Sequence, residues 1–142
     1  MNHTVLLVDD DTNVLHGLAR VLRGQPYRLY TARSAYEAMA IIKAQNVDVI
    51  VSDEQMPGIT GTDLLVWVAD HYPDIMRIVL TGHATTETAI QAINQGDVYR
   101  FFTKPCDEVQ LALTIRKAME HKDALEETRR VLSSQGGRGG SR

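Results

Sequence analysis

The sequence predicts an α/β domain built on a doubly wound, five-stranded parallel sheet with helices on both faces. Short β-rich runs alternate five times with longer segments of helical periodicity. Two of these runs, 47–51 and 78–80, are nearly continuous in apolar residues, which is typical of central parallel strands covered on both faces. The length of 142 residues fits a single domain with a substantial core.

The expected strands lie at residues 4–8, 27–31, 47–52, 75–81 and 98–103. Each is joined to the next by a helical segment, and such units form right-handed crossovers. We therefore expect the strand order 2-1-3-4-5, a flavodoxin-like arrangement. In sheets of this kind the functional groups gather beyond the carboxyl ends of the strands, where the strand order reverses.

The first three helices carry clear start and stop signals. The first ends before Gly24 and Pro26, the second opens with a capping box of Ser34 and Glu37, and the third ends at Pro73. The apolar residues that we expect to face the sheet are Val14, Leu15, Leu18, Val21 and Leu22 in the first helix, Ala35, Ala38, Met39 and Ile42 in the second, and Leu64, Leu65, Val68 and Tyr72 in the third.

The last two helices differ in character. A thinner fourth helix is expected to start at Thr85 or Thr86 and to end at Gly96, and Asp107 with Gln110 opens the fifth. A polar, charge-rich pattern then continues through residues 119–132 without Gly or Pro. The fifth helix should therefore extend past the compact domain.

The end of the chain suggests a division into a compact domain at 1–120, a helical extension at 121–134 and a flexible Gly/Ser/Arg linker or tail at 135–142. The extension is either a solvated helix or part of a coiled coil. Two positions of its heptad-like seam are charged, which weakens the coiled-coil interpretation. The seam consists of Leu111, Ile115, Ala118, Lys122, Leu125, Arg129 and Leu132.

Composition and charge exclude several classes of protein. Residues 1–115 hold 8 Lys and Arg against 14 Asp and Glu, a charge of −6, whereas residues 116–142 carry +3. An acidic body disfavours direct binding of nucleic acid by this domain. The single cysteine, Cys106, makes an internal disulfide impossible and structural zinc improbable. No run is long enough to cross a membrane and no signal peptide is apparent, so we expect a cytoplasmic protein.

Chemically active side chains follow four of the expected strands. Asp9, Asp10 and Asp11 follow the first strand, Asp53 the third, Thr81 ends the fourth and Lys104 follows the fifth. Each residue alone has an ordinary structural explanation: a solvated acidic turn, a helix entry or a surface lysine. Because parallel strands end at the same edge of a sheet, their joint placement instead predicts a site.

Electrostatics restricts what this site can bind. Two carboxylates about 4 Å apart repel by roughly 4 kcal/mol at an effective dielectric near 20, so positive charge must offset them. A set of oxygen ligands without His or Cys suits Mg²⁺, and Lys104 supplies a second positive charge. A metal, a lysine and a hydroxyl around a free carboxylate are the usual equipment for accepting a phosphoryl group.

Four motifs carry a family resemblance: VLLVDDD at 5–11, SDEQMPGITG at 52–61, LTG at 80–82 and FFTKP at 101–105. In this order and spacing they resemble the response-regulator receiver domains of two-component signalling, over residues 4 to about 120. Asp10 and Asp53 are 43 residues apart, Thr81 follows 28 residues later and Lys104 another 23.

The resemblance implies a role for each matching residue. Asp53 would accept a phosphoryl group from a phosphohistidine on a sensor kinase or phosphotransfer protein. Mg²⁺ would be bound by Asp10, Asp53 and the backbone carbonyl of Gln55, with Asp9 acting directly or through water. Thr81 would hydrogen-bond one phosphoryl oxygen and Lys104 would pair with another. The family does not fix Asp11, which we interpret as a first-turn acidic residue of the helix.

The resemblance also implies a switch. When Thr81 moves toward the phosphoryl group, Phe101 would turn inward and change the surface of the fourth helix, fifth strand and fifth helix, which could form a homodimer. Simple edge-strand packing is the alternative interpretation of Phe101.

Other positions near the site depart from the commonest family patterns. Glu54 and Gln55 follow Asp53, where they can steer water or the leaving phosphoryl group. Cys106 stands where many relatives carry a bulkier residue. The Lys104-Pro105 bond is a candidate cis peptide, a hypothesis that rests on the tight turn that would direct Lys104 at the site.

Residues 92–105 further resemble receivers joined to cyclic-di-GMP phosphodiesterases of the HD-GYP type and receivers of enhancer-dependent transcription activators. The resemblance therefore implies a C-terminal output domain beyond residue 142 without choosing between these outputs. The domain itself is expected to be a phosphorylation-dependent switch rather than a multiple-turnover enzyme, with no membrane partner.

Two other functions use similar elements. A haloacid-dehalogenase-type phosphatase has an Asp nucleophile, Mg²⁺ and a lysine, but its first motif requires Thr or Val where this chain has Asn13 after Asp9 and Asp11. A flavodoxin-like binding module needs Ser, Thr and Gly donors after the first strand, where this chain is acidic and would repel a phosphate. Both remain alternatives to the receiver.

Overall fold

A computed structural model of the chain describes residues 3–82 and 98–140, with side chains described through residue 134. In these residues five strands form one sheet: β1 (Thr4–Val8), β2 (Arg28–Ala32), β3 (Val49–Asp53), β4 (Met76–Thr81) and β5 (Arg100–Thr103). Each neighbouring pair is parallel and the order is β2-β1-β3-β4-β5. The predicted fold class and strand order are confirmed.

Four of the strands begin slightly later than the apolar runs predicted. Val47 and Ile75 are buried although they precede β3 and β4. Their apolar character therefore reflects burial and not membership of a strand. The backbone N–H of Met76 bonds to the carbonyl of Asp48, which aligns the entries of the two strands.

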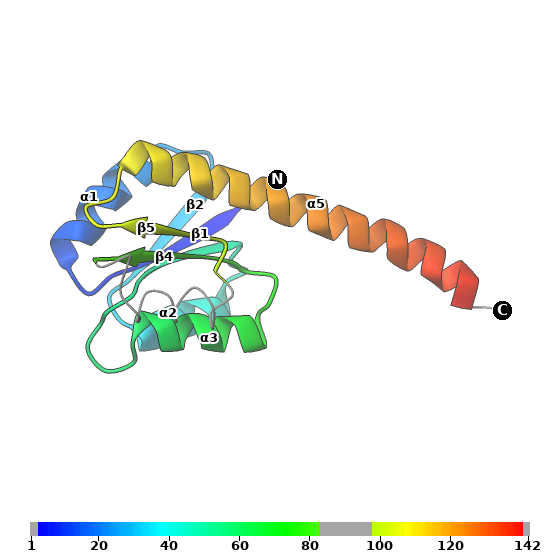
Figure 1. Cartoon of the computed structure of the whole chain (residues 1–142), viewed down its shortest axis with the longest axis horizontal. Coiled ribbons are helices and arrows are strands. Elements are labelled where there is room, and N and C mark those ends of the chain that lie inside the picture. Colours follow the sequence, from blue (N-terminus) through cyan, green and yellow to red (C-terminus); the bar gives the residue numbers. More distant parts are fainter. Residues whose placement is uncertain (1–2, 83–97, 141–142) are drawn as a thin grey trace.

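In the part of the chain that the structure describes, two helices cover each face of the sheet (Figure 1). One face holds α1 (Thr12–Leu22) and α5 (Glu108–Gly140), and the other holds α2 (Ala35–Ala44) and α3 (Gly61–His71). Alternate residues of a strand point to opposite faces. Accordingly, Val5 and Leu7 of β1 join the core under α1 and α5, and Leu6 and Val8 join the core under α2 and α3. The predicted fourth helix lies outside the described residues.

The predicted helix starts are formed by side-chain caps. The Ser34 hydroxyl accepts the N–H of Glu37 at 3.1 Å, and the Asp107 carboxylate accepts the N–H of Gln110 at 3.1 Å. The predicted stripes are buried apart from four residues that are only partly buried, Val14, Val21, Met39 and Tyr72. Ala19 is buried in α1 without having been predicted.

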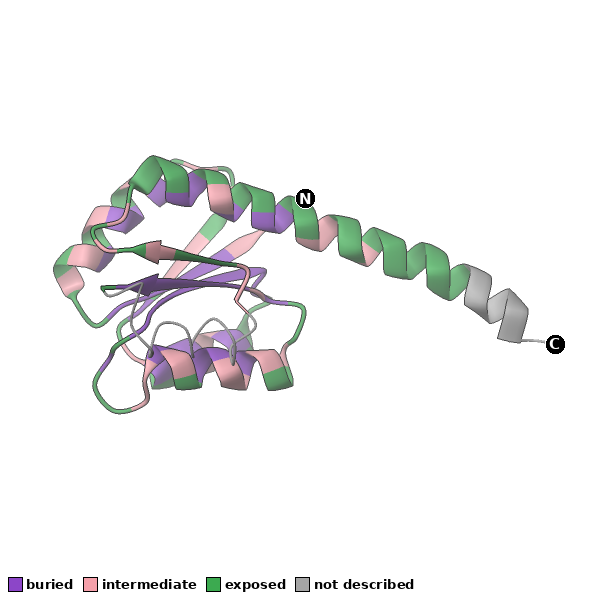
Figure 2. Ribbon diagram, in the orientation of Figure 1, coloured by how far each residue is buried: buried purple, intermediate pink, exposed green. Residues whose placement is uncertain are grey.

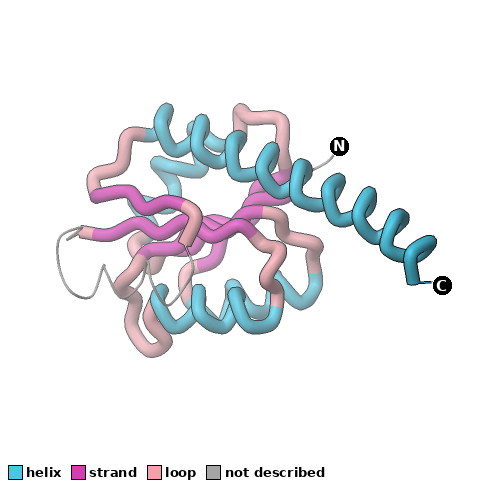
Figure 3. The backbone as a smooth tube through the Cα atoms, turned by 45° about the vertical axis from the view of Figure 1, so that its right-hand side comes forward, coloured by secondary structure: helices cyan, strands magenta, loops and turns pink. Residues whose placement is uncertain are grey.

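Helix α5 begins in the core and then leaves it (Figures 1 and 3). Leu111, Ile115 and Ala118 are fully buried, whereas Leu125 and Leu132 of the same seam are 41% and 60% exposed. Figure 2 shows this change from buried to exposed residues along the helix. The predicted seam therefore divides between the domain core and the solvent. The helix also continues through Gly140, where the composition favoured a flexible tail from residue 135.

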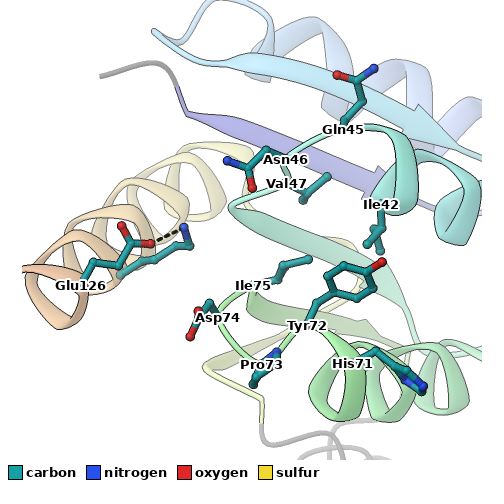
Figure 4. Close-up of a pocket in the computed structure, with 11 residues that line it drawn as sticks. Ile42, Gln45, Asn46, Val47, His71, Tyr72, Pro73, Asp74, Ile75 and Glu126 are labelled. Atoms are coloured by element: carbon teal, nitrogen blue, oxygen red, sulfur yellow. Dashed lines mark hydrogen bonds and ion pairs between the residues drawn. The ribbon is translucent and has the colours of Figure 1, made fainter. Parts of the chain in front are cut away.

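Two side-chain contacts, Lys122 with Asp48 and His3 with Asp123, attach the first part of the extension to the amino-terminal end of the sheet. The Lys122 ammonium lies 2.8 Å from Asp48 and 2.7 Å from Glu126, and the His3 ring lies 3.0 Å from Asp123. Figure 4 shows Glu126 beside the cleft that separates the extension from the turns before β3 and β4. This cleft lies at the opposite end of the strands from the predicted site.

Replacing Lys122 by Met should lower the free energy of unfolding by about 2–3 kcal/mol. The substitution leaves the buried Asp48 carboxylate with the N–H of Thr4, at 2.8 Å, as its remaining recorded partner. Urea unfolding measures the loss. The matched control is Arg130→Met, which removes an exposed pair with Glu127 and should cost less than about 0.5 kcal/mol. Equal losses in the two variants would contradict this account.

Candidate functional site

The predicted site residues lie at the carboxyl ends of adjacent strands. Asp9 and Asp10 follow β1, Asp53 is the last residue of β3, Thr81 ends β4 and Lys104 follows β5. Because β1, β3, β4 and β5 are consecutive neighbours in the sheet, these five residues share one edge. The fold thus brings together side chains that are as far as 95 residues apart in sequence.

Lys104 connects the buried carboxylates of Asp9 and Asp53. Its ammonium lies 3.0 Å from Oδ2 of Asp9 and 3.1 Å from Oδ1 of Asp53. The backbone N–H of Lys104 bonds to the carbonyl of Thr81 at 2.8 Å, which fixes the start of the loop after β5. Asp9 is fully buried and Asp53 is 7% exposed, so the ion pairs are largely shielded from water. Lys104 therefore holds a positive charge directly beside the Asp53 carboxylate.

Asp9 is fixed by the turn that follows β1. Its Oδ1 accepts the N–H of Asp11 at 2.9 Å, and its own N–H bonds to the carbonyl of Ala32. Asp11 itself is the N-cap of α1 and accepts the N–H groups of Asn13 and Val14. The interpretation of Asp11 as a first-turn residue was therefore wrong: it precedes the first turn and caps the helix by hydrogen bonds.

Burial and the neighbouring charges shift the pKa values of Asp53 and Lys104. Burial and the neighbouring Asp9 raise the pKa of Asp53 above its ordinary value, although Lys104 and the N–H of Gln55 oppose the shift. Burial would lower the pKa of Lys104, but its hydrogen bonds and charge interactions with Asp9 and Asp53 raise it overall. Lys104 is therefore charged at neutral pH, and the Asp53 carboxylate is destabilised by its surroundings.

Replacing Asp53 by Asn should stabilise the domain at neutral pH in the absence of divalent cations. In the wild type, the folded chain binds the Asp53 proton more tightly than the unfolded chain does. The stability that protonation of Asp53 gives to the folded state is therefore complete below about pH 3.8 and is lost as the pH rises through the raised pKa. We expect a gain on the order of 1 kcal/mol near pH 7 that shrinks toward pH 4.

Urea unfolding at several pH values checks this expectation. Asp9 still pairs with Lys104 in the variant, so the ammonium does not lose both partners. If the Asp53→Asn variant were less stable than the wild type near pH 7, the surroundings of Asp53 would not destabilise its carboxylate as described.

Three carboxylates at this edge offer ligands to a cation. Oxygen atoms of Asp9, Asp10 and Asp53 all lie within 4.8 Å of one another. Asp10 is exposed, whereas the other two are buried. An all-oxygen set with one side open to water fits Mg²⁺, which keeps several of its waters and needs only one or two carboxylates. The acidic pocket therefore fits this ion.

Thr81 makes a contact that the sequence did not predict. It is buried, and its hydroxyl donates a hydrogen bond to the carboxylate of Glu54. Glu54 is only 3% exposed, whereas the adjacent Gln55 is exposed. A glutamate directly after a strand gives no sequence signal for burial, because glutamate is usually solvated.

Gly61 is required for the close approach of the loop after β3. A Cβ at this position would lie 1.7 Å from the carbonyl oxygen of Asp53, and the N–H of Gly61 bonds to the carbonyl of Glu54 at 2.9 Å. Gly58 adopts a φ of 79°, which favours glycine. The motif at 52–61 carried both glycines, but only the structure shows why Gly61 cannot bear a side chain.

The remaining predicted residues lie around this edge. The Lys104-Pro105 peptide bond is cis, in agreement with the hypothesis drawn from the sequence. Burial, followed by the Asp107 and Glu108 carboxylates, raises the pKa of the Cys106 thiol to about 11, so the thiol is neutral. Phe101 on β5 is 44% exposed, so it does not pack inward in this structure.

Comparisons with known proteins agree with this geometry. The family model for the response regulator receiver domain matches residues 5–116. The chain is 39% identical over 117 residues to the hydrogenase transcriptional regulatory protein HoxA of Cupriavidus necator, and 31% identical over 133 residues to the nitrogen assimilation regulatory protein NtrX of Azorhizobium caulinodans. These matches cover 82% and 92% of this chain but 24% and 29% of the relatives. The chain thus spans about a quarter of the length of these curated relatives.

Solved structures give the same result. The signal receiver domain of an HD domain-containing protein from Pseudomonas fluorescens Pf-5 has a TM-score of 0.84 at 35% identity, covering 87% of this chain and 99% of that one. NtrX from Brucella abortus, solved with ADP, has a TM-score of 0.82 at 28% identity, covering 90% of this chain and 29% of that one. Among the described residues, no helix is long and apolar enough to cross a membrane. The chain belongs to the response regulator receiver domain family.

Proposed function

We propose that Asp53 is the phosphoacceptor of a switch that is controlled by a sensor histidine kinase or a phosphotransfer protein. The observation that carries this proposal is the position of the Lys104 ammonium, 3.1 Å from Asp53 and 3.0 Å from Asp9. A fixed positive charge beside a carboxylate nucleophile neutralises charge on an incoming phosphoryl group.

The transfer step forms one bond and breaks one. A carboxylate oxygen of Asp53 forms the new O–P bond while the P–N bond of the donor phosphohistidine breaks, and the electron pair of that bond stays on the imidazole nitrogen. Lys104 stays beside the reacting carboxylate through its second partner, Asp9. The acyl phosphate later reacts with water, which returns Asp53 to its free form and releases inorganic phosphate. One phosphorylation per signal makes the domain a switch and not a multiple-turnover enzyme.

Asp9, Asp10, Asp53 and the backbone carbonyl of Gln55 would hold Mg²⁺ at this site. When bound, the ion supplies positive charge that neutralises the carboxylates and the phosphoryl oxygens. The support for this assignment is the grouping of the three carboxylates within 4.8 Å. Asp9 would act directly or through water, because one of its oxygens already pairs with Lys104.

Thr81 and Phe101 would carry the signal away from Asp53. The Thr81 hydroxyl would move to a phosphoryl oxygen, and Phe101, which is exposed in this structure, would turn inward. The surface of β5 and α5, together with the fourth helix that the sequence predicts, would then change its preference for a partner or for a second copy of this chain.

The output of this switch would lie in a C-terminal domain beyond residue 142. Support comes from the length of the relatives, of which this chain spans about a quarter, and from their names as transcriptional regulators. The receiver of an HD domain-containing protein favours a second kind of output. The acidic receiver itself would contact neither nucleic acid nor membrane and would act in the cytoplasm.

Incubation with acetyl phosphate and Mg²⁺, followed by intact-mass measurement, tests the proposal. We expect one phosphoryl group per chain, formed only when the divalent ion is present and lost by hydrolysis on prolonged incubation. Steady turnover of small phosphate esters that depends on Asp9 rather than Asp53 would support the phosphatase alternative, and a bound yellow chromophore would support the flavodoxin-like alternative.

A further inference from the structure

Glu54 occupies a position that the proposed phosphotransfer does not use. It is adjacent to Asp53 in sequence, it is 3% exposed, and its carboxylate accepts a hydrogen bond from the Thr81 hydroxyl. Among the described residues, the acidic side chains of the metal cluster are Asp9, Asp10 and Asp53, so Glu54 is outside that cluster. Its recorded side-chain partner is the residue that is expected to respond to phosphorylation.

Three hydrogen bonds hold the backbone of Glu54 and Thr81 beside this contact. The N–H of Glu54 bonds to the carbonyl of Leu80 at 2.8 Å, and the carbonyl of Glu54 accepts the N–H of Gly61 at 2.9 Å. The carbonyl of Thr81 accepts the N–H of Lys104 at 2.8 Å. Rearrangement of the contact therefore falls on the two side chains.

We propose that Glu54 is a positioning residue that holds Thr81 in its unphosphorylated arrangement and opposes activation. This inference rests on the proposed function of Asp53 and Thr81. A hydroxyl group has one proton to donate, so Thr81 cannot donate to Glu54 and to a phosphoryl oxygen at the same time. Activation must break the contact with Glu54 and leave a buried carboxylate without this donor, which is unfavourable.

Charge acts in the same direction. A phosphorylated Asp53 places additional negative charge next to the buried Glu54 carboxylate, and like charges repel strongly where water is excluded. Glu54 thus resists activation through both its hydrogen bond to Thr81 and its charge. The balance between the unphosphorylated and phosphorylated arrangements is then set partly by a residue outside the phosphoacceptor and metal groups.

A double-mutant cycle with beryllofluoride, a stable mimic of the phosphoryl group, tests the proposal. Fluorine NMR in the presence of Mg²⁺ measures the dissociation constant for wild type, Glu54→Met, Thr81→Ala and the double variant. We expect Glu54→Met to tighten binding about tenfold, equivalent to ~1.4 kcal/mol, in the chain that retains Thr81. In the Thr81→Ala background the same substitution should change binding less than about threefold, because the hydrogen-bond competition is gone.

Two further variants complete the experiment. Glu54→Gln keeps an acceptor oxygen but removes the charge, so its affinity should lie between those of wild type and Glu54→Met; it also tests the proposal if Glu54→Met does not fold. Glu127→Met, which changes an exposed glutamate on α5, should leave the affinity unchanged. The same fold-change for Glu54→Met in both Thr81 backgrounds would overturn the positioning of Thr81 by Glu54, because an effect of charge alone does not depend on the Thr81 hydroxyl. Weaker binding by Glu54→Met would overturn both the positioning role and the effect of charge. Absence of binding by the wild type would instead overturn the proposed function of Asp53.

Discussion

The Asp53→Asn variant is expected to lose phosphorylation by acetyl phosphate, with a rate reduced by more than about 1000-fold. Asparagine has nearly the shape of aspartate but has no carboxylate oxygen to form the O–P bond. The fold should survive, because Lys104 keeps its 3.0 Å contact with Asp9. Phosphoryl incorporation in the presence of Mg²⁺, followed by intact mass over time, measures the effect.

The matched control for this experiment is Asp11→Asn in the acidic run after β1. Asp11 caps α1 through its side chain, and asparagine caps helices about as well as aspartate. Its rate should therefore stay within about twofold of the wild-type rate. A normal rate in Asp53→Asn, or an equal loss in both variants, would show that the acceptor is another residue or that charge alone is responsible.

Gly61→Ala is expected to lower the free energy of unfolding by about 3 kcal/mol or more. The added Cβ would lie 1.7 Å from the carbonyl oxygen of Asp53 and 2.7 Å from its carbonyl carbon. Both are backbone atoms at the end of β3, so they cannot turn away as a flexible side chain could. The loop after β3 would have to shift and would displace the phosphoacceptor with it.

Gly17→Ala serves as the control for that substitution. Gly17 lies within α1, and a Cβ there would meet no atom within 4 Å. Alanine in a helix interior should raise the free energy of unfolding by roughly 0.5–1 kcal/mol. Urea unfolding of both variants gives the comparison. A loss of less than about 1 kcal/mol in Gly61→Ala would contradict the described packing of the loop against β3.

Much of the fold could be predicted because its signals are local. Apolar runs marked the strands, and Ser34 and Asp107 marked helix starts that the structure forms with the expected caps. The grouping of Asp9, Asp53 and Lys104 followed from one topological rule, that parallel strands end at a common edge. Their separation of as many as 95 residues in sequence was no obstacle once the strand order was known.

The features that escaped prediction depend on contacts between distant segments. The hydrogen bond from Thr81 to Glu54 depends on the relative positions of the carboxyl ends of β3 and β4 at atomic detail. The spacing of apolar residues along the chain carries no such information. The need for Gly61 arises in the same way, from its approach to Asp53. For α5, composition favoured a flexible tail from residue 135, whereas the helix continues through Gly140.

The most direct test of the account is the location of the phosphoryl group on the chain. Borohydride reduces an aspartyl phosphate to homoserine, which marks the modified residue permanently and can be found by peptide mass spectrometry. After treatment with acetyl phosphate and Mg²⁺, we predict homoserine at position 53. Homoserine at position 9, 10 or 11, or none anywhere in a chain that has taken up phosphate, would contradict the assignment of Asp53 as the acceptor.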